Sequence, residues 1–356
     1  MVVRTKSPTN DSIETTLGRR ASVRDVALAA GASIASVSRV LNGSGYASES
    51  LRERVARAVE ATGYTPNFSA KHLRTGRSKA VGLMMSNLDN PFISTFVASV
   101  ERHMQAAGYS LLIASAYDMP SREEELMTLF ESRQLEGVIA SPGVENLPRK
   151  QNPFARCKLP LIILDREIEC DGDVVCLDHR NGVRQAVEYL TSLGHQRIAL
   201  LGPNAHIRPG REKVLGYQDG LEASGLDFDP ALVCMMKSAI DSPREQVEAM
   251  LKLPRRPTAV IGLGTRLLST TLHTARRSGL EIPRDLSVVG IGTDDVFAFM
   301  YPPITLLRFN LDQAAQATAS LMLERLSGNA APARRRVTIP LDLIVGATCA
   351  IPSTQG

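Results

Sequence analysis

The chain has 356 residues, 44% of them hydrophobic, with 41 Lys+Arg, 37 Asp+Glu and five cysteines. This length exceeds that of one compact domain, and no apolar run is long enough to span a bilayer. The N-terminus lacks the apolar core of a signal peptide, and the cysteines form no CxxC pair. These features argue against a membrane protein, disulfides and zinc sites, and they favour a reducing cytoplasm with no membrane partner.

Charge is unevenly distributed along the chain. Residues 1–79 contain 13 Lys+Arg and 6 Asp+Glu, a net charge of +7, whereas the whole chain carries +4 and residues 80–356 therefore carry −3. A basic segment joined to a mildly acidic body is typical of a DNA-binding domain attached to a domain that does not bind DNA. Residues 1–21 are polar and aperiodic, which predicts a disordered basic extension.

Residues 22–42, SVRDVALAAGASIASVSRVLN, predict two short helices joined by a tight turn. Ser22 followed by Asp25 is a capping-box pattern for the first helix. Gly31 can adopt the left-handed conformation that ends a helix, and Ser33 can cap the second helix. A third helix is expected after Ser48. This arrangement is typical of a helix-turn-helix DNA-binding motif.

The second helix of this motif is polar and small on its outer side. Val37, Val40 and Leu41 point inward at helical spacing, which leaves Ile34, Ala35, Ser36, Ser38 and Arg39 near or on the outside. Small residues there let the helix enter a major groove, where Arg39 can grip a guanine edge for about 1–3 kcal/mol of discrimination. The alternative is an ordinary surface helix pair with one solvated arginine.

Beyond residue 80 the sequence alternates strand-like runs with amphipathic stretches, which predicts an α/β fold with parallel sheets covered on both faces. So long a segment predicts two lobes. The strand-like runs are AVGLMM, SLLIA, GVIA, LIIL, VVCL, RIALL, AVIGL and LSVVGI.

The order and spacing of many sequence motifs resemble those of the lactose-repressor (LacI–GalR) family of bacterial transcription regulators. The resemblance runs from about residue 22 to about residue 348. The motifs are DVALAAGAS, VSRVLN, RERVARAVEATGYTPN, AKHL, VGLMM, NPF, EGVIA, LDR, SLGHQRIALLGP, GYQDGL, TAVIGL and SGLEIPRDLSVVG.

The resemblance implies an all-helical head and a two-lobed core similar to periplasmic binding proteins, with an effector in the cleft. The implied boundaries are a head at 22–66, a hinge helix and linker at 67–79, and an effector-binding and dimerisation core at 80–350. Within the core, the first lobe is expected at about 80–191 and 307–330. The second lobe is expected at about 194–305 and 333–348.

The resemblance also implies positions that contact DNA. Ile34, Ala35 and Arg39 match base-reading positions, and Leu73 of the AKHL run matches a hinge leucine that wedges into the minor groove. The alternative for residues 70–73 is a basic, solvated linker. The full predicted DNA-binding set is Ser33, Ile34, Ala35, Ser36, Ser38, Arg39, Asn42, Lys71, Leu73 and Arg74.

A second set of positions matches the family's effector cleft. Phe92 is expected to stack on a ligand or, alternatively, to pack in the core, and Asp178 is expected to bind the ligand or to cap a helix. The full predicted set is Asn90, Phe92, Asp165, Arg166, Asp178, Asn181, Lys213, Gly264 and Thr265.

Three of these positions depart from the family pattern, with Lys213 in place of arginine and Gly264–Thr265 in place of Asn–Asp. Lysine is a point charge, and a missing carboxylate removes an acceptor for sugar hydroxyls. These departures favour an anionic effector, such as a sugar acid or a phosphorylated sugar, over a neutral sugar. A degenerate cleft that binds no small ligand is the alternative.

The sequence contains no P-loop, GxSxG or HExxH motif, and the run Glu123–Glu125 is expected to be a solvated helix start. We therefore expect no enzyme, metal or cofactor. The resulting prediction is a ligand-responsive transcriptional regulator, a repressor that binds a palindromic operator as a homodimer. A small-molecule binding protein for transport, a sugar-processing enzyme and a regulator controlled by a protein partner are the alternatives.

Overall fold

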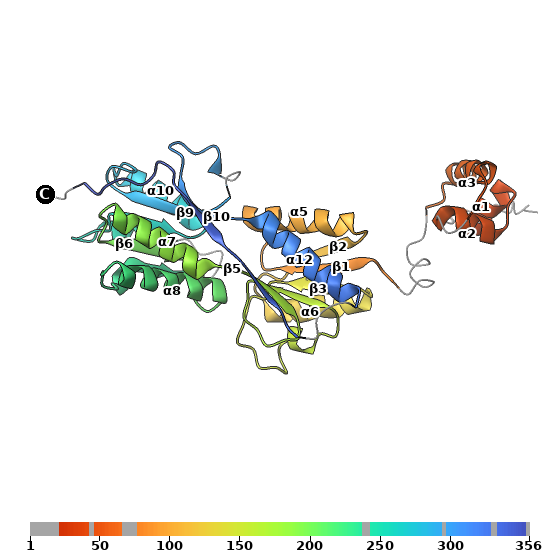
Figure 1. Cartoon of the computed structure of the whole chain (residues 1–356), viewed down its shortest axis with the longest axis horizontal. Helices are drawn as coiled ribbons and strands as arrows, with labels where there is room; N and C mark the ends of the chain where they lie inside the picture. The colour runs from red at the N-terminus through yellow and green to blue at the C-terminus, as the bar shows by residue number, and fades with distance from the viewer. Residues whose placement is uncertain are drawn as a thin grey trace, which may run out of the picture. The chain divides into compact units, whose positions relative to one another are not determined.

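The computed structural model describes residues 21–42, 46–65, 77–236, 243–293, 297–328 and 333–353. The chain divides into two compact units, a head that ends at Arg77 and a core that begins at Ser78 (Figure 1). The described head is helical and the core contains two largely parallel sheets, which confirms the predicted fold class.

The head contains helices α1 (Val23–Ala30), α2 (Ile34–Asn42) and α3 (Glu49–Thr62). The predicted capping box is present, because the Ser22 backbone N–H donates to Asp25 at 2.7 Å while the Asp25 N–H donates to the Ser22 hydroxyl at 3.4 Å. Gly31 ends α1 with a φ of +56°, and the Ser36 N–H donates to Ser33 at 3.1 Å. Local sequence therefore sets the helix–turn–helix geometry.

A small apolar core holds the three helices together. Its buried residues come from all three helices: Val26, Ala27, Ala30, Val37, Val55 and Ala58. Ser48 occupies the N-cap position of α3 as expected, although its side chain makes no capping hydrogen bond.

Each lobe of the core is built on a six-stranded sheet within the described residues. The first sheet, in the order β11-β5-β4-β3-β1-β2, consists of β1 (Ala80–Met85), β2 (Ser110–Ser115), β3 (Gly137–Ala140), β4 (Leu161–Leu164), β5 (Asp173–Leu177) and β11 (Arg336–Ile339). The second, in the order β12-β10-β9-β8-β6-β7, consists of β6 (Ile198–Gly202), β7 (Val233–Met235), β8 (Ala259–Gly262), β9 (Ser287–Gly292), β10 (Thr305–Phe309) and β12 (Leu341–Ile344). Among the strands that the structure describes, only the pairing of β10 with β12 is antiparallel.

The first sheet is covered on both faces, as its continuous apolar strands require. Val81, Leu83 and Met85 of β1 pack toward α5 (Pro91–Ala106) and α12 (Leu311–Leu326). Met84, on the opposite face, packs with residues of α6 (Pro120–Ser132). A Cβ on Gly82 would lie 2.6 Å from the Phe130 ring, so the close approach of α6 requires glycine there.

The second sheet follows the same plan. Helices α7 (His179–Ser192) and α8 (Arg208–Ala223) lie side by side on one face, and the Tyr217 hydroxyl of α8 donates to the Ile198 carbonyl at 2.7 Å (Figure 1). Helices α9 (Arg244–Leu251) and α10 (Thr265–Arg277) cover the other face. Two short 3-10 turns, Phe154–Arg156 and Pro230–Leu232, precede β4 and β7. None of the described helices has the length and apolarity to cross a membrane.

The chain passes between the lobes three times, each time through a single residue. Asp178 follows β5, Asn310 follows β10 and Pro340 lies between β11 and β12. These residues are neighbours, since the Asp178 N–H donates to the Ile339 carbonyl at 2.9 Å and Phe309 pairs with Leu341. The connections form a compact hinge.

The crossovers differ from the lobe boundaries expected from sequence. The segment 80–191 was expected to lie in the first lobe, but α7 packs against α8 in the second. The start of 307–330 belongs to β10 of the second sheet, and β11, within 333–348, pairs with β5 of the first. Backbone pairing register, which sequence periodicity does not reveal, decides these assignments.

Candidate functional site

Helix α2 presents the side chains expected to read DNA. Ile34 is 46% exposed, Ala35 and Arg39 are exposed, and Val37 between them is fully buried. Ser33 is exposed as well, while Ser36 and Ser38 are half-buried. The buried stripe fixes the helix on the head and leaves Ile34, Ala35 and Arg39 on the outer side.

Part of the predicted DNA-binding set lies outside the described residues. Lys71, Leu73 and Arg74 fall in the segment 66–76, so the hinge helix stays a prediction. Asn42 is the last residue of α2, and its side chain also lies outside the described part.

A cavity of about 920 Å³ lies between the two lobes of the core. Its walls come from the carboxyl ends of strands in both sheets and from the helices that follow them, where open parallel sheets bind ligands. Seven of the nine predicted effector residues line it: Asn90, Phe92, Asp165, Arg166, Lys213, Gly264 and Thr265.

Asp178 and Asn181 do not belong to the cavity lining. The Asp178 carboxylate accepts a hydrogen bond from the Asn181 N–H at 3.3 Å and caps α7, and the Asn181 side-chain oxygen accepts from Arg184 at 2.9 Å. The helix-capping alternative therefore accounts for Asp178.

Phe92 belongs both to the cavity wall and to the core. Its ring is 7% exposed, and it packs with Phe297 and Phe309 at centroid distances of 6.1 and 5.7 Å. Asn90 caps the helix that carries Phe92, because its side-chain oxygen accepts from the Phe92 N–H at 3.1 Å. The two interpretations of Phe92 made from sequence are compatible.

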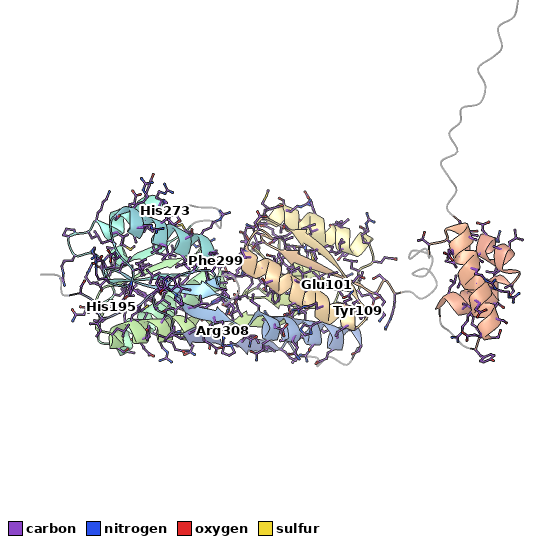
Figure 2. The ribbon with its side chains drawn as sticks, turned by 90° about the horizontal axis from the view of Figure 1, so that it is seen from above. Glu101, Tyr109, His195, His273, Phe299 and Arg308 are labelled. Carbon is purple, nitrogen blue, oxygen red and sulfur yellow. The ribbon has the colours of Figure 1, made fainter. Side chains whose placement is uncertain are left out.

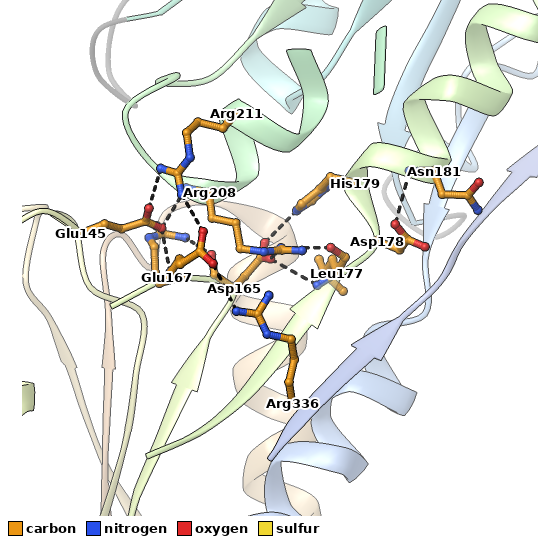
Figure 3. A network of polar contacts seen from close by, with 11 residues as sticks. Glu145, Asp165, Glu167, Leu177, Asp178, His179, Asn181, Arg208, Arg211 and Arg336 are labelled. Atoms are coloured by element: carbon orange, nitrogen blue, oxygen red, sulfur yellow. Dashed lines mark hydrogen bonds and ion pairs between the residues drawn. The ribbon is translucent and has the colours of Figure 1, made fainter. Parts of the chain in front are cut away.

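Asp165 is the centre of a polar network at the cavity (Figure 3). One carboxylate oxygen accepts from the Leu177 N–H at 3.2 Å and from Arg208 at 2.6 Å. The other lies 2.7 Å from Nε2 of His179. Asp165 adopts a φ of +50°, a left-handed conformation that aspartate tolerates better than most residues. Both oxygens are therefore engaged by protein groups.

The network sets the protonation of its members. Burial alone would raise the pKa of Asp165, but His179, Arg208 and Arg166 hold it well below its ordinary value. Burial lowers the pKa of His179 despite the adjacent carboxylate. Nε2 of His179 therefore faces an ionised Asp165 carboxylate. Nδ1 of His179 is buried and has no hydrogen-bond partner among the described residues.

A second group of contacts joins the lobes beside Asp165 (Figure 3). Glu145 of the first lobe accepts from the Arg208 backbone N–H of the second lobe at 2.8 Å, so it caps the first turn of α8. Its other oxygen accepts from the Arg211 side chain at 2.6 Å, and Arg211 also reaches Glu167 at 3.2 Å. Within the first lobe, Arg336 of β11 lies 3.4 Å from Glu167. First-lobe carboxylates thus meet second-lobe cations at this edge.

Sequence reasoning missed Glu145, His179, Arg208 and Arg211. A usable signal existed, because Glu145 and Glu167 follow β3 and β4, and the arginines follow β6. Residues after parallel strands gather at one sheet edge, so acidic and basic groups after strands of different lobes are expected to meet across a cleft.

Lys213 stands on α8 and is 5% exposed. Burial lowers its pKa to about 8, with Arg166 lowering it further and Asp165 raising it. Thr265 begins α10, and its buried hydroxyl has no partner among the described residues. Gly264 is the N-cap residue of the same helix.

Glu123 contradicts the expectation of a solvated acidic run. Glu124 and Glu125 are exposed and pair with Arg156 and Arg122, but Glu123 is fully buried. One of its oxygens accepts from the Gly143 N–H at 2.7 Å and the other has no partner in the described part of the chain. Burial raises the pKa of Glu123 to about 7. Helical periodicity turns this one acid inward.

The cavity offers a mixed apolar and charged surface to a ligand. The described residues contain no group of three His, Cys, Asp or Glu side chains that could hold a metal ion.

Two families of known proteins match the two parts of the chain. The family described as bacterial regulatory proteins, lacI family, matches residues 22–67, and the periplasmic binding protein-like domain matches residues 187–349. Together they cover the head and more than half of the core.

Curated relatives match nearly the whole chain. The transcriptional regulator MalR of Streptomyces coelicolor is 29% identical over 342 residues, covering 93% of this chain and 98% of MalR. The transcriptional repressor CytR of Escherichia coli is 26% identical over 334 residues, covering 93% of this chain and 97% of CytR.

Solved structures show the same architecture. The lac repressor dimer bound to operator and the anti-inducer ONPF superimposes with a TM-score of 0.83 at 24% identity, covering 93% of this chain and all of that chain. The complex of the regulator CelR with cellobiose has a TM-score of 0.69 at 26% identity, covering 92% and 100%.

Proposed function

The chain belongs to the lacI family of bacterial regulatory proteins, and we propose that it represses transcription as a homodimer on a palindromic operator, with a small metabolite in the interlobe cavity modulating its affinity. It is a DNA-binding transcriptional regulator and not an enzyme, as its curated relatives are regulators. We place it in the bacterial cytoplasm, on the nucleoid.

The outer side of α2 supports recognition of operator DNA. Ile34 and Ala35 offer only apolar contact, for instance to a thymine methyl group, and Arg39 is the residue able to make a bidentate contact to guanine. Each head reads one half-site, so a dimer requires two half-sites related by symmetry.

Exposed apolar side chains on the core support a homodimer. Leu112 and Ile113 are each 39% exposed on β2, the edge strand of the first sheet. In the second lobe Phe299, which is labelled in Figure 2, is 84% exposed, and Tyr301 is 95% exposed. Apolar residues exposed on both lobes are expected to be covered by a second copy of the chain.

The observation that carries the ligand-responsive part of the proposal is the cavity between lobes that meet at a three-residue hinge. A ligand that contacts both lobes favours one lobe angle over another, and the angle determines how the paired heads are presented. Operator binding must change effector affinity by the same factor, because the coupling is reciprocal.

Mapping of bound genomic sites tests the proposal. We expect the bound sites to share a palindrome. In a gel-shift experiment, the purified protein should retard DNA fragments that carry this palindrome, with two protein chains bound to each fragment. Arg39→Ala should weaken binding to this palindrome by about 1–3 kcal/mol and leave binding to random DNA nearly unchanged. Arg57→Ala, on an exposed position of α3, is the control. An equal loss of affinity for the palindrome and for random DNA would mean that Arg39 contacts only phosphates. Bound genomic sites that share no palindrome would contradict the proposal.

A further inference from the structure

Hydrogen-bond acceptors at the interlobe cavity are largely occupied by the protein itself. Asp165 is a half-buried carboxylate of the lining, and its two oxygens accept from Leu177, Arg208 and His179. A sugar needs acceptors for its hydroxyl protons, and ionised carboxylates are the strongest acceptors in proteins. This carboxylate has little capacity left for a sugar.

The amide side chains of the lining are committed in the same way. The side-chain oxygens of Asn87, Asn90 and Asn204 accept backbone hydrogen bonds at 2.8, 3.1 and 2.8 Å. Two other lining carboxylates, Asp89 and Asp118, lie at exposed positions where water competes for them. The carboxylate and amide oxygens of the lining are therefore mostly engaged, and the Thr265 hydroxyl and His179 Nδ1 are buried polar atoms of the lining without a partner among the described residues.

Lys213 presents the opposite situation. Its side chain lines the cavity and is 95% buried, and no hydrogen bond or ion pair to its amino group occurs within the described residues. The charges of Asp165 and Arg166 act on the Lys213 amino group, and the charge of Lys213 in turn acts on His179. Asp165, whose charge acts on Lys213, is already shared with His179 and Arg208, so the ammonium group has only a shared counterion. Such a group is costly unless an anion accompanies it.

The remaining walls are apolar. The side chains that enclose the cavity come from strands and helices of both lobes, and they include Phe96, Leu164, Val175, Leu263, Ile291 and Phe309. A ligand covered by these walls gains about 25 cal/mol for each Å² of its own apolar surface, which a hydroxylated ring does not offer.

We infer that the effector is a small carboxylic acid with an apolar aryl or alkyl body, whose carboxylate pairs with Lys213 and whose body fills the apolar walls. This inference rests on the proposed function, because it assigns a ligand class to the same cavity. It departs from the carbohydrate expectation drawn from the sequence, since the walls are largely apolar and the lining carboxylate and amide oxygens mostly accept from protein groups.

Titration calorimetry on the full-length protein tests the ligand class with four probes. Phenylacetate carries both features, phenylacetamide lacks the charge, glucuronate lacks the apolar body and glucose lacks both. We expect phenylacetate to bind about tenfold or more tightly than each of the others. Tighter binding of glucose or glucuronate, or no binding of phenylacetate, would overturn the inference.

Two variants test the role of Lys213. Lys213→Met should lower phenylacetate affinity about tenfold, to the level of phenylacetamide, and Lys252→Met, at an exposed position of the same lobe, should leave it unchanged. Unaltered affinity in Lys213→Met would reject the ion pair. The wild-type protein gives a second readout, because affinity should fall as the pH rises above about 8, where Lys213 loses its proton. A flat profile from pH 7 to pH 9 would count against it.

Operator binding, measured separately by fluorescence anisotropy without ligand, distinguishes this inference from the proposed function. A protein that binds a palindrome but not phenylacetate retains the proposed function and loses the ligand class. A protein that binds phenylacetate through Lys213 but has no palindromic site retains the ligand class and loses the proposed function.

Discussion

The two lobes of the core share one topology and differ in the charge they bring to the cleft. Their strand orders correspond position by position. In the ion pairs that join the lobes, the first lobe contributes Glu145, Asp165 and Glu167, whereas the second contributes Arg208 and Arg211. The same scaffold therefore yields two complementary surfaces, because the residues after the strands, and not the strands, determine the charge.

The lobes also bury one costly group each. In the first lobe Glu123 has a pKa raised to about 7, and in the second Lys213 has a pKa lowered to about 8. The charged form of either side chain destabilises the folded protein. Glu123 is charged above its pKa, whereas Lys213 is charged below its pKa. The two lobes should therefore respond to pH with opposite signs.

Of the substitutions that test the difference between the lobes, loss of the Asp165 charge should change the free energy of unfolding most. Asp165→Asn leaves Arg208, Arg166 and Lys213 without a buried anion, and we expect a loss of about 3–5 kcal/mol in the free energy of unfolding by urea at pH 7. Wild-type stability from this carboxylate is present above its unfolded pKa and is lost as the pH falls. The matched control is Asp342→Asn, an exposed partner of Arg308, and a loss no greater than in this control would contradict the role of Asp165.

Glu123→Gln tests the buried acid of the first lobe. The folded state holds the proton more tightly than the unfolded state, so wild-type stability falls as the pH rises from about 4.5 through 7. The variant should gain up to about 3 kcal/mol at pH 8 and almost nothing at pH 4 in thermal or urea unfolding. Glu124→Gln, at an exposed position, should show no such pH-dependent gain, and equal behaviour of the two variants would refute the assignment.

Lys213→Met tests the buried base of the second lobe and should have a similar or slightly smaller effect. The charged lysine destabilises the folded protein below about pH 8, so the ligand-free variant should be more stable at pH 7 by about 2–3 kcal/mol. The difference should shrink as the pH rises from 8 toward 10.5. A difference that grows over this interval would have the wrong sign.

The smallest effect is expected from the interlobe pair at the rim. Arg211 is 35% exposed, so Arg211→Ala should cost about 1 kcal/mol, chiefly because the Glu145 oxygen loses its partner. Arg149→Ala, which removes an exposed pair with Glu169, is the control and should have almost no effect. If both variants unfold at the same urea concentration, the interlobe contact contributes nothing to stability.

Much of the fold follows from the sequence because its signals are local. Ser22, Gly31 and Ser33 specify the turn of the head within a few residues, and the apolar runs coincide with buried strands. The assignment of β11 and β12 to different sheets does not follow, because RVTI and LDLI look alike and only Pro340 separates them. Their partners, β5 and β10, lie far away in the chain.

The sequence predicted single residues that line the cavity, but it did not predict which side chains contact each other across the site. Lys213 and Thr265 could be singled out by motif position, and both line the cavity. The pairing of Glu145 with Arg208 joins residues that no periodicity relates, across two lobes. The burial of Glu123 likewise depends on Gly143, which lies on another segment of the first lobe.

The late position of β11 in the chain has a consequence for how the protein folds as it is synthesised. The buried Asp173 carboxylate emerges with β5, but its partners Arg325 and Arg335 are made only after the strands β6 to β10 of the second lobe. Until then Asp173 has no counterion and β5 is an unpaired edge. We therefore expect the parallel strands of the second lobe to assemble during synthesis while the first lobe still lacks β11, and the last segment to complete both sheets.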